Sequence, residues 1–168
     1  TGYLGFSGSS GASGGTYLSV KDFKGSTAYS LSQDPTGESI LDPGTGPFTW
    51  EFYLNVPPRA NDNQVIAQKI SGSNGITIFL SSSASKTSPT TKADVVTIVK
   101  SGDQYLSSSF EIDKGKFNHI AAVLDRASGP GQILMYRNGI KISTSNYSNL
   151  SQIDFKTSPL TLGSGTLQ

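Results

Sequence analysis

The feature that most limits the fold of this 168-residue chain is the alternation of apolar and polar side chains in short segments. The clearest segment is Phe48–Val56, in which every second residue is apolar, including Phe48, Trp50 and Phe52. Side chains of a strand point alternately to opposite faces, so the pattern predicts a strand with one face on a core. We therefore expect Trp50 to be mostly buried. Pro57-Pro58 ends the strand, because proline has no N–H to donate to a neighbouring strand.

Short segments of this kind, separated by Gly, Pro, Asn, Asp and Ser, continue along the chain, and none has the period of a helix. The expected strands are Thr16–Val20, Ala28–Leu31, Phe48–Val56, Gln64–Ile70, Gly75–Leu80, Asp94–Lys100, Gln104–Ser108, Lys116–Leu124, Gln132–Arg137, Ile140–Ser143 and Leu160–Leu162. Asn138-Gly139 predicts a type I′ hairpin turn, which needs two positive φ angles. Many short strands in one domain predict two stacked antiparallel sheets.

Glycine occupies every third position at the start of the chain, at Gly2, Gly5, Gly8, Gly11 and Gly14. A collagen triple helix requires this period, because only glycine fits at the axis where three chains meet. A flexible Gly/Ser linker is the alternative, but a linker has no reason to keep a strict period. Residues 1–15 are therefore predicted to be the end of a collagen-like stalk, and residues 16–168 a domain carried in three copies.

The residues between these glycines include no proline, unlike the triplets of animal collagens. They resemble the Ser- and aromatic-filled triplets of tailed-phage fibres and some bacterial surface proteins. Such a short run of triplets cannot support a triple helix alone, so we expect more of the stalk upstream. The chain has no initiator Met and no signal peptide, which favours a fragment or a processed product.

The composition excludes several classes of partner and chemistry. Charged residues make up 15% of the chain and the net charge is +1, which gives no electrostatic reason to expect nucleic acid or a charged membrane as partner. No apolar run approaches the ~20 residues that span a bilayer, so membrane insertion is not expected. The chain has no cysteine, which excludes disulfides, a Cys nucleophile and thiolate metal sites.

Several segments, in their order along the chain, resemble the concanavalin A-like lectin/glucanase superfamily, in its laminin-G and pentraxin-like branch. They are Tyr17–Val20, Pro47–Phe52 ("pFTiE"), Val65–Lys69, Lys116–Asp125 ("kWhHvAvvyD", with Phe117 for Trp), Tyr136–Gly139 ("YvNG") and Pro159–Gly163 ("plliG"). The resemblance implies an all-β, two-sheet jelly-roll sandwich and says little about its ligand. Family members usually continue into one further strand, so we expect that strand to lie beyond this chain or a neighbouring chain to cover the edge.

Glucanases of this superfamily carry two carboxylates on one strand, in a motif such as Glu-x-Asp-x-x-Glu. Glu111-Ile112-Asp113 resembles the start of the motif, but no second Glu follows, so we expect Glu111 and Asp113 to flank a surface turn and the protein not to be an enzyme. His119 is the only histidine, and the resemblance implies a structural, hydrogen-bonded role within a strand. Both rows of that strand, Lys116–Leu124, contain apolar residues, so we expect it to be central and covered on both sides.

Two oxygen-rich clusters are the candidates for calcium, which is common in this superfamily. They are Asn61-Asp62-Asn63 and the set Asp34, Glu38 and Asp42. Neither has a spaced ligand pattern, and ordinary turn chemistry explains both. We assign no metal ligand and expect no other cofactor.

For a sugar site we expect an aromatic platform beside amide and carboxylate groups. Tyr53 points away from the core row together with Glu51 and Asn55, and Tyr105 lies in a polar strand. These four residues are the candidate ligand-binding residues, with ordinary surface tyrosines as the alternative.

These observations predict a non-catalytic head domain on the surface of a virion or phage fibre, homotrimeric through its stalk, that binds host glycans or other virion proteins. A bacterial surface adhesin or carbohydrate-binding module, also extracellular, is the first alternative. A glucanase-type hydrolase is the second, and a purely structural head stays open. The sequence names neither the glycan nor the host.

Overall fold

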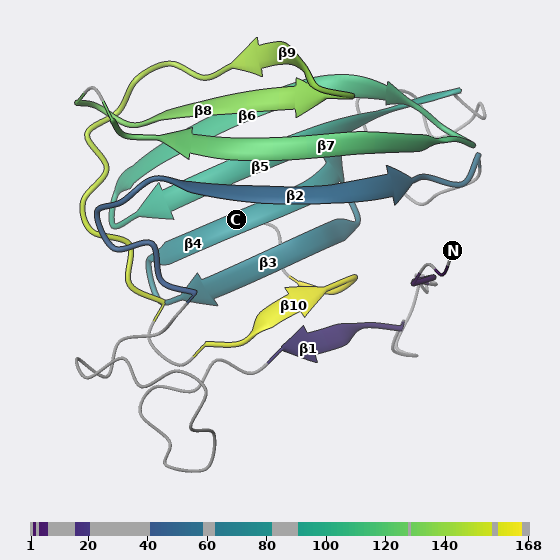
Figure 1. Ribbon diagram of the computed structural model, residues 1–168. Coiled ribbons are helices and arrows are strands. Elements are labelled where there is room, and N and C mark those ends of the chain that lie inside the picture. The colour runs from purple at the N-terminus through teal and green to yellow at the C-terminus, as the bar shows by residue number, and fades with distance from the viewer. Residues whose placement is uncertain are drawn as a thin grey trace.

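A computed structural model describes residues 2, 4–6, 16–20, 41–58, 63–81, 91–127, 129–155 and 158–165. Within these residues the chain forms strands and no helix (Figure 1). The strands are β1 (Leu18–Val20), β2 (Phe48–Asn55), β3 (Val65–Ser71), β4 (Asn74–Ser81), β5 (Lys92–Ser101), β6 (Gln104–Asp113), β7 (Phe117–Asp125), β8 (Gln132–Arg137), β9 (Ile140–Thr144) and β10 (Leu160–Leu162). The expected strand Ala28–Leu31 lies outside the described residues.

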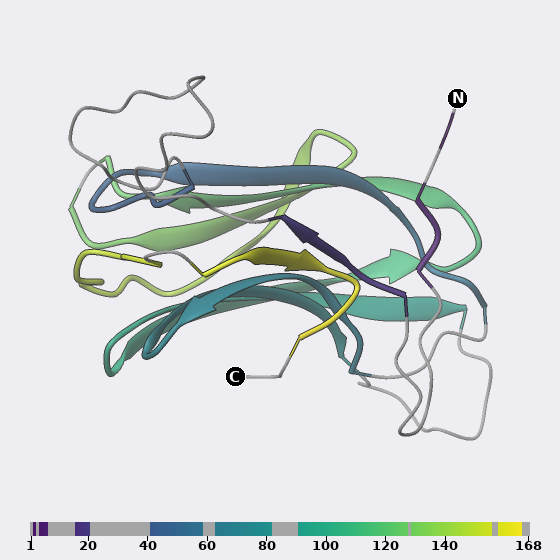
Figure 2. The ribbon, with the colours of Figure 1, turned by 90° about the horizontal axis from the view of Figure 1, so that it is seen from below.

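The strands form two antiparallel sheets, which confirms the predicted all-β, two-sheet architecture. One sheet has the order β1-β10-β3-β4-β5-β6 and the other the order β2-β7-β8-β9. Figure 2 shows them stacked as two layers, with the apolar core between them. No helix of the described residues is long and apolar enough to cross a membrane.

The core is built from the inward rows of both sheets. The four-stranded sheet contributes fully buried side chains such as Ile120 and Met135, and the six-stranded sheet contributes Ile78 and Val95. β6 adds Leu106, Ser108, Phe110 and Ile112, which alternate with exposed residues. This strand is longer than expected and contains Glu111, because its alternation continues through a Ser-rich stretch whose small polar residues weaken the signal.

Trp50 is mostly buried, as expected, but its side chain is not fully covered. The row Phe48, Trp50, Phe52 and Leu54 faces the core as predicted, but all four side chains are only partly buried. β2 is the end strand of its sheet, with β7 as its partner among the described strands, so the core covers this row incompletely. The register of the strand is as expected, and the position at the edge explains the exposure.

Two further expectations concern β7 and the turn after β8. β7 is central, as expected, between β2 and β8, but it is not covered on both sides, because Phe117 is exposed. Asn138 and Gly139 have φ angles of 52° and 79°, as the predicted I′ turn requires.

The N-terminal segment lies against the end of the domain. Gly163 follows β10 with φ of 80°, and a Cβ there would come within 2.5 Å of the Phe6 ring, so the ring lies on bare backbone. Gly2 and Gly5 are described, but Gly8, Gly11 and Gly14 are not, so the collagen-like stalk stays a prediction.

Burial in the core predicts a difference between two aromatic substitutions. Phe110→Ala, at a buried position, is expected to cost about 3–5 kcal/mol of unfolding free energy, and Trp50→Ala less, because part of its ring stays in water in the folded state. Urea denaturation of both variants measures the two losses of unfolding free energy. Equal losses would mean that Trp50 is covered in solution.

Candidate functional site

The outer face of the four-stranded sheet brings together three of the four predicted binding residues. Glu51, Tyr53 and Asn55 alternate with the inward row of β2, and all three are exposed. β2 pairs with β7 so that Glu51 lies opposite Ala121, Tyr53 opposite His119, and Asn55 opposite Phe117. Directly opposite residues share a face of the sheet, so β7 adds its own side chains to the predicted set.

A hydrogen bond joins the two strands on this face. His119 Nε2 lies 2.7 Å from Glu51 Oε1, and the centroids of the His119 and Tyr53 rings are 4.9 Å apart. The Glu51 side chain is 61% exposed and that of His119 is 21% exposed. The pair therefore fixes an accessible carboxylate against a mostly covered imidazole, beside a tyrosine ring.

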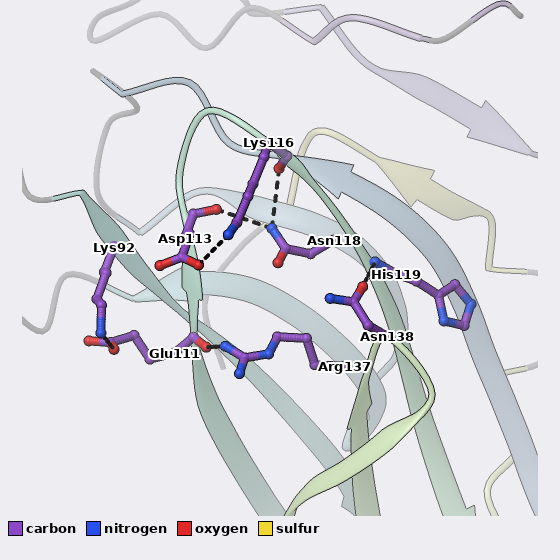
Figure 3. A network of polar contacts seen from close by, with 8 residues as sticks. All are labelled: Lys92, Glu111, Asp113, Lys116, Asn118, His119, Arg137 and Asn138. Carbon is purple, nitrogen blue, oxygen red and sulfur yellow. Dashed lines mark hydrogen bonds and ion pairs between the residues drawn. The ribbon is translucent and has the colours of Figure 1, made fainter.

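The turn after β8 holds the backbone of His119 in place. His119 N–H donates to Asn138 Oδ1 at 2.9 Å, and Asn138 N–H donates to the His119 carbonyl at 2.9 Å. Figure 3 shows Asn138 beside His119, whose ring extends away from the turn. The structural, hydrogen-bonded role expected for His119 agrees with these contacts, but the ring also belongs to the candidate site.

Aromatic side chains widen this face. Tyr53 is 72% exposed and Phe117 is 53% exposed. Tyr136 of β8 lies opposite Ala121, so the small Ala121 side chain separates Glu51 from Tyr136 across the sheet. We call Glu51, Tyr53, Asn55, Phe117, His119 and Tyr136 the outer-face cluster. It presents apolar rings and hydrogen-bonding groups together, which is the combination that sugars require.

Sequence reasoning missed Phe117, His119 and Tyr136. Their alternation with buried residues was visible, but both rows of β7 contain apolar residues, so the sequence did not distinguish the core row from the solvent row. Only the pairing of β2 with β7 identifies the row that contains His119 as the outer one.

The fourth predicted residue, Tyr105, lies elsewhere. It is in β6, in the other sheet, opposite Lys100 of β5, and its side chain is exposed. Tyr105 therefore does not join the outer-face cluster.

Glu111 and Asp113 each pair with a lysine. Lys92 Nζ lies 2.5 Å from Glu111 Oε1, and Lys116 Nζ lies 2.7 Å from Asp113 Oδ2 (Figure 3). The hydrogen bond and charge of Lys116 lower the pKa of Asp113. Arg137 Nη1 donates to the Glu111 carbonyl at 2.9 Å, which ties the end of β8 to β6 of the other sheet. Glu111 lies within β6, not beside a turn as expected, whereas Asp113 ends the strand at one.

A second polar cluster lies inside the molecule. Lys69 is 1% exposed, and its Nζ donates to the Ser158 carbonyl at 2.5 Å and lies 5.4 Å from the centroid of the Phe155 ring. Phe155 N–H donates to Asp42 Oδ1 at 3.0 Å. Burial raises the pKa of Asp42, and the neighbouring Asp154 raises it further. These contacts hold the segments before β2 and before β10 against β3.

The calcium candidates are mostly outside the described residues. Asp34, Glu38, Asn61 and Asp62 are not described, so neither cluster is tested. Asn63 has a φ of 58°, as is common for Asn in a turn. In the part of the chain that the structure describes, no three His, Asp or Glu residues are grouped to hold a metal ion.

Comparison with known proteins gives one family. A family model described as the concanavalin A-like lectin/glucanases superfamily matches residues 14–167. No curated protein and no solved structure gives a significant match to the chain. The match covers nearly the whole chain, including every strand of both sheets.

Asp42 predicts a pH dependence of stability. Its folded pKa is raised above the ordinary 3.8, so its contribution to stability is fully present below that value and is lost as the pH rises through the folded pKa. Asp42→Asn stays neutral and keeps an acceptor for Phe155 N–H. Its stability relative to the wild type should therefore increase as the pH rises from about 3 to about 7, the range in which carboxyl groups in proteins titrate. Urea denaturation across this range measures the difference. A variant that loses stability relative to wild type at neutral pH would mean that attraction to Lys69 outweighs the cost of burial.

Proposed function

Because the chain belongs to the concanavalin A-like lectin/glucanase superfamily, we propose that it is a non-catalytic sugar-binding head and that the outer-face cluster holds the sugar. The observation that carries the proposal is the Glu51–His119 hydrogen bond beside the exposed Tyr53 ring. The family includes both lectins and glucanases, so the choice between them depends on the residues.

The cluster has the chemistry for a neutral or amino sugar. The Tyr53 and Phe117 rings offer apolar surface to the C–H face of a pyranose. The lone pairs of the Glu51 carboxylate that His119 does not use can accept hydrogen bonds from hydroxyls. The bond from His119 holds Glu51 in place before the ligand arrives, which lowers the entropy lost on binding. Asn55 adds an amide that both donates and accepts.

The setting that we propose is the surface of a tailed-phage fibre or another virion appendage. The glycine period supports a homotrimer on a collagen-like stalk, and the low charge and absence of cysteine are in keeping with such a particle. Three weak sites on one stalk would bind a repetitive host surface more tightly than one site, through effective concentration. A bacterial adhesin with the same head is the second candidate and would use the same site.

The contacts of Glu111 and Asp113 support a head without hydrolase activity. A retaining glycosidase needs two carboxyl groups about 5–5.5 Å apart, one of which donates a proton. The ion pair with Lys116 favours the charged form of Asp113, which cannot donate, and Glu111 is held by Lys92.

A glycan array with single substitutions tests the site. Tyr53→Ala and Glu51→Gln should each weaken binding to a captured glycan about tenfold, which corresponds to about 1.4 kcal/mol, because each removes one type of contact. Tyr105→Ala, an exposed tyrosine on the other sheet, is the matched control and should bind as the wild type does. Binding that depends on Tyr105 and not on Tyr53 would place the site on the six-stranded sheet and contradict the proposed site.

The absence of hydrolase activity is tested separately. Replacing Glu111 and Asp113 together by Ala should leave glycan binding unchanged, and neither protein should release reducing sugar from β-glucans. Release by the wild type that disappears in the double variant would overturn the non-enzymatic assignment.

The stalk predicts the state of assembly. With its upstream triplets the protein should be a trimer by light scattering, and removal of residues 1–15 and everything before them should weaken association without unfolding the heads, since each head has its own core. Replacing Gly8 by a bulky residue should loosen the heads at the stalk junction. A protein with its stalk that stays monomeric at high concentration would contradict the trimer and the avidity mechanism.

A further inference from the structure

The carboxylate in the outer-face cluster differs from two others on this domain in its partner. Among the described residues, no lysine or arginine pairs with Glu51, which is 61% exposed and bonds to His119 Nε2 at 2.7 Å. Glu111 and Asp113, by contrast, each pair with a lysine. Histidine is usually neutral at neutral pH, and a neutral imidazole that donates to Glu51 leaves the negative charge of the carboxylate uncompensated.

The hydrogen bond from His119 uses one of the two carboxylate oxygens. It reaches Oε1 of Glu51 and leaves Oε2 as an acceptor for a ligand. The backbone N–H of His119 is itself held by Asn138 Oδ1 at 2.9 Å. The site therefore presents an anionic group that is fixed in place and still has unused acceptor positions.

Aromatic rings lie in two directions from Glu51. Tyr53 follows it on the same face of β2, and the centroid of the Tyr53 ring is 4.9 Å from that of His119. Tyr136 lies on the other side of Ala121, which is opposite Glu51. The face of a tyrosine ring attracts a cation that lies within about 6 Å of its centroid. The carboxylate and the rings therefore favour the same kind of ligand group, a cation.

The lysines near this face do not cancel the charge of Glu51. The strands β2, β7, β8 and β9 lie side by side in one layer, and Lys141 of β9 is opposite Tyr136 (Figure 1). Three strand spacings put its backbone roughly 14 Å from that of Glu51. This exceeds the screening length of about 8 Å at physiological ionic strength. Lys116, at the start of β7, already pairs with Asp113.

We infer that the outer-face cluster selects glycans that carry an ammonium group, and that Glu51 determines this selectivity. The inference rests on the proposed sugar-binding function and adds the class of sugar, an amino sugar whose amine is not acetylated. The ammonium group donates to Oε2 of Glu51 beside the Tyr53 ring. A hydrogen bond between two charged groups is stronger than one from a neutral hydroxyl, and an anionic sugar would be repelled.

Three oligosaccharides of one length and linkage test the selectivity, because they differ at C2 of each sugar. They are a chitosan oligomer with free amines, a chitin oligomer with acetylated amines, and a cellulose oligomer with hydroxyls. Calorimetry near neutral pH and at low ionic strength should give severalfold tighter binding of the free-amine oligomer than of either neutral one. Added salt should reduce this preference.

Two matched variants assign the preference to one carboxylate. Glu51→Gln keeps the length of the side chain and an acceptor but removes the charge, so the three oligomers should bind with similar affinity. Glu111→Gln is the control, because Glu111 is 52% exposed but lies in the other sheet and pairs with Lys92. This variant should keep the preference of the wild type.

A second measurement locates the amine on the protein. His119 is the only histidine, so its imidazole protons give signals in an NMR spectrum that no other residue shares. Glucosamine should shift these signals until the site is saturated, and glucose should shift them severalfold less. The difference between the two sugars should disappear in Glu51→Gln.

The outcomes separate this inference from the proposed function. Equal binding of the three oligomers, dependent on Tyr53, would keep the sugar site and overturn the selectivity, as would a preference that persists in Glu51→Gln. The absence of a response to every amine-bearing probe would overturn the inference, whichever glycan the array captures. A Glu51-dependent shift with glucosamine, without binding of any oligomer, would support the ammonium site and contradict the glycan site of the proposed function.

Discussion

The pairing of β7 with β2 is the interaction on which both the core and the candidate site depend. β7 buries Ile120, Ala122 and Leu124 between the sheets. The residues that alternate with them, including His119 and Ala121, belong to the outer row and lie opposite Tyr53 and Glu51. Because the two rows alternate along one strand, a shift of one residue would move His119 into the core and Ile120 into water.

The two sheets differ in how well their end strands are covered and in how far they extend. β2 leaves Trp50 and its neighbours partly exposed, whereas the opposite layer extends past β3 to β10 and β1. The contacts of Lys69 with Ser158 and Phe155 lie where the segment before β10 crosses β3. A buried ammonium needs such partners, since without them its desolvation would not be offset. The polar cluster and the incomplete cover of β2 are thus two features of a sandwich whose layers differ in width.

Local pattern predicted the strands well, because alternation is a property of a few neighbouring residues. Phe48–Val56 and Gln132–Arg137 were found nearly to the residue, and the Asn138-Gly139 turn was found from two residues alone. Only about half of the candidate site could be predicted in this way. Tyr53, Glu51 and Asn55 follow from one strand, but His119 and Tyr136 join them through pairings between distant segments, and the separation of Tyr105 from them is a matter of sheet order. The burial of Lys69 could not be predicted, because it depends on the path of the segment before β10.

The Glu51–His119 hydrogen bond joins residues 68 positions apart, and this separation affects how the site comes into being. Contacts so distant in sequence require a long loop to close first, so they form late and cooperatively when a β-sandwich folds. A partly folded head has no fragment of the site to offer, since Tyr53 and His119 meet only when both strands are in register. In the trimer that we propose, each head would then be either fully competent or inert, and the number of folded heads, rather than a graded affinity of each, would determine how firmly the protein holds a glycan-bearing surface.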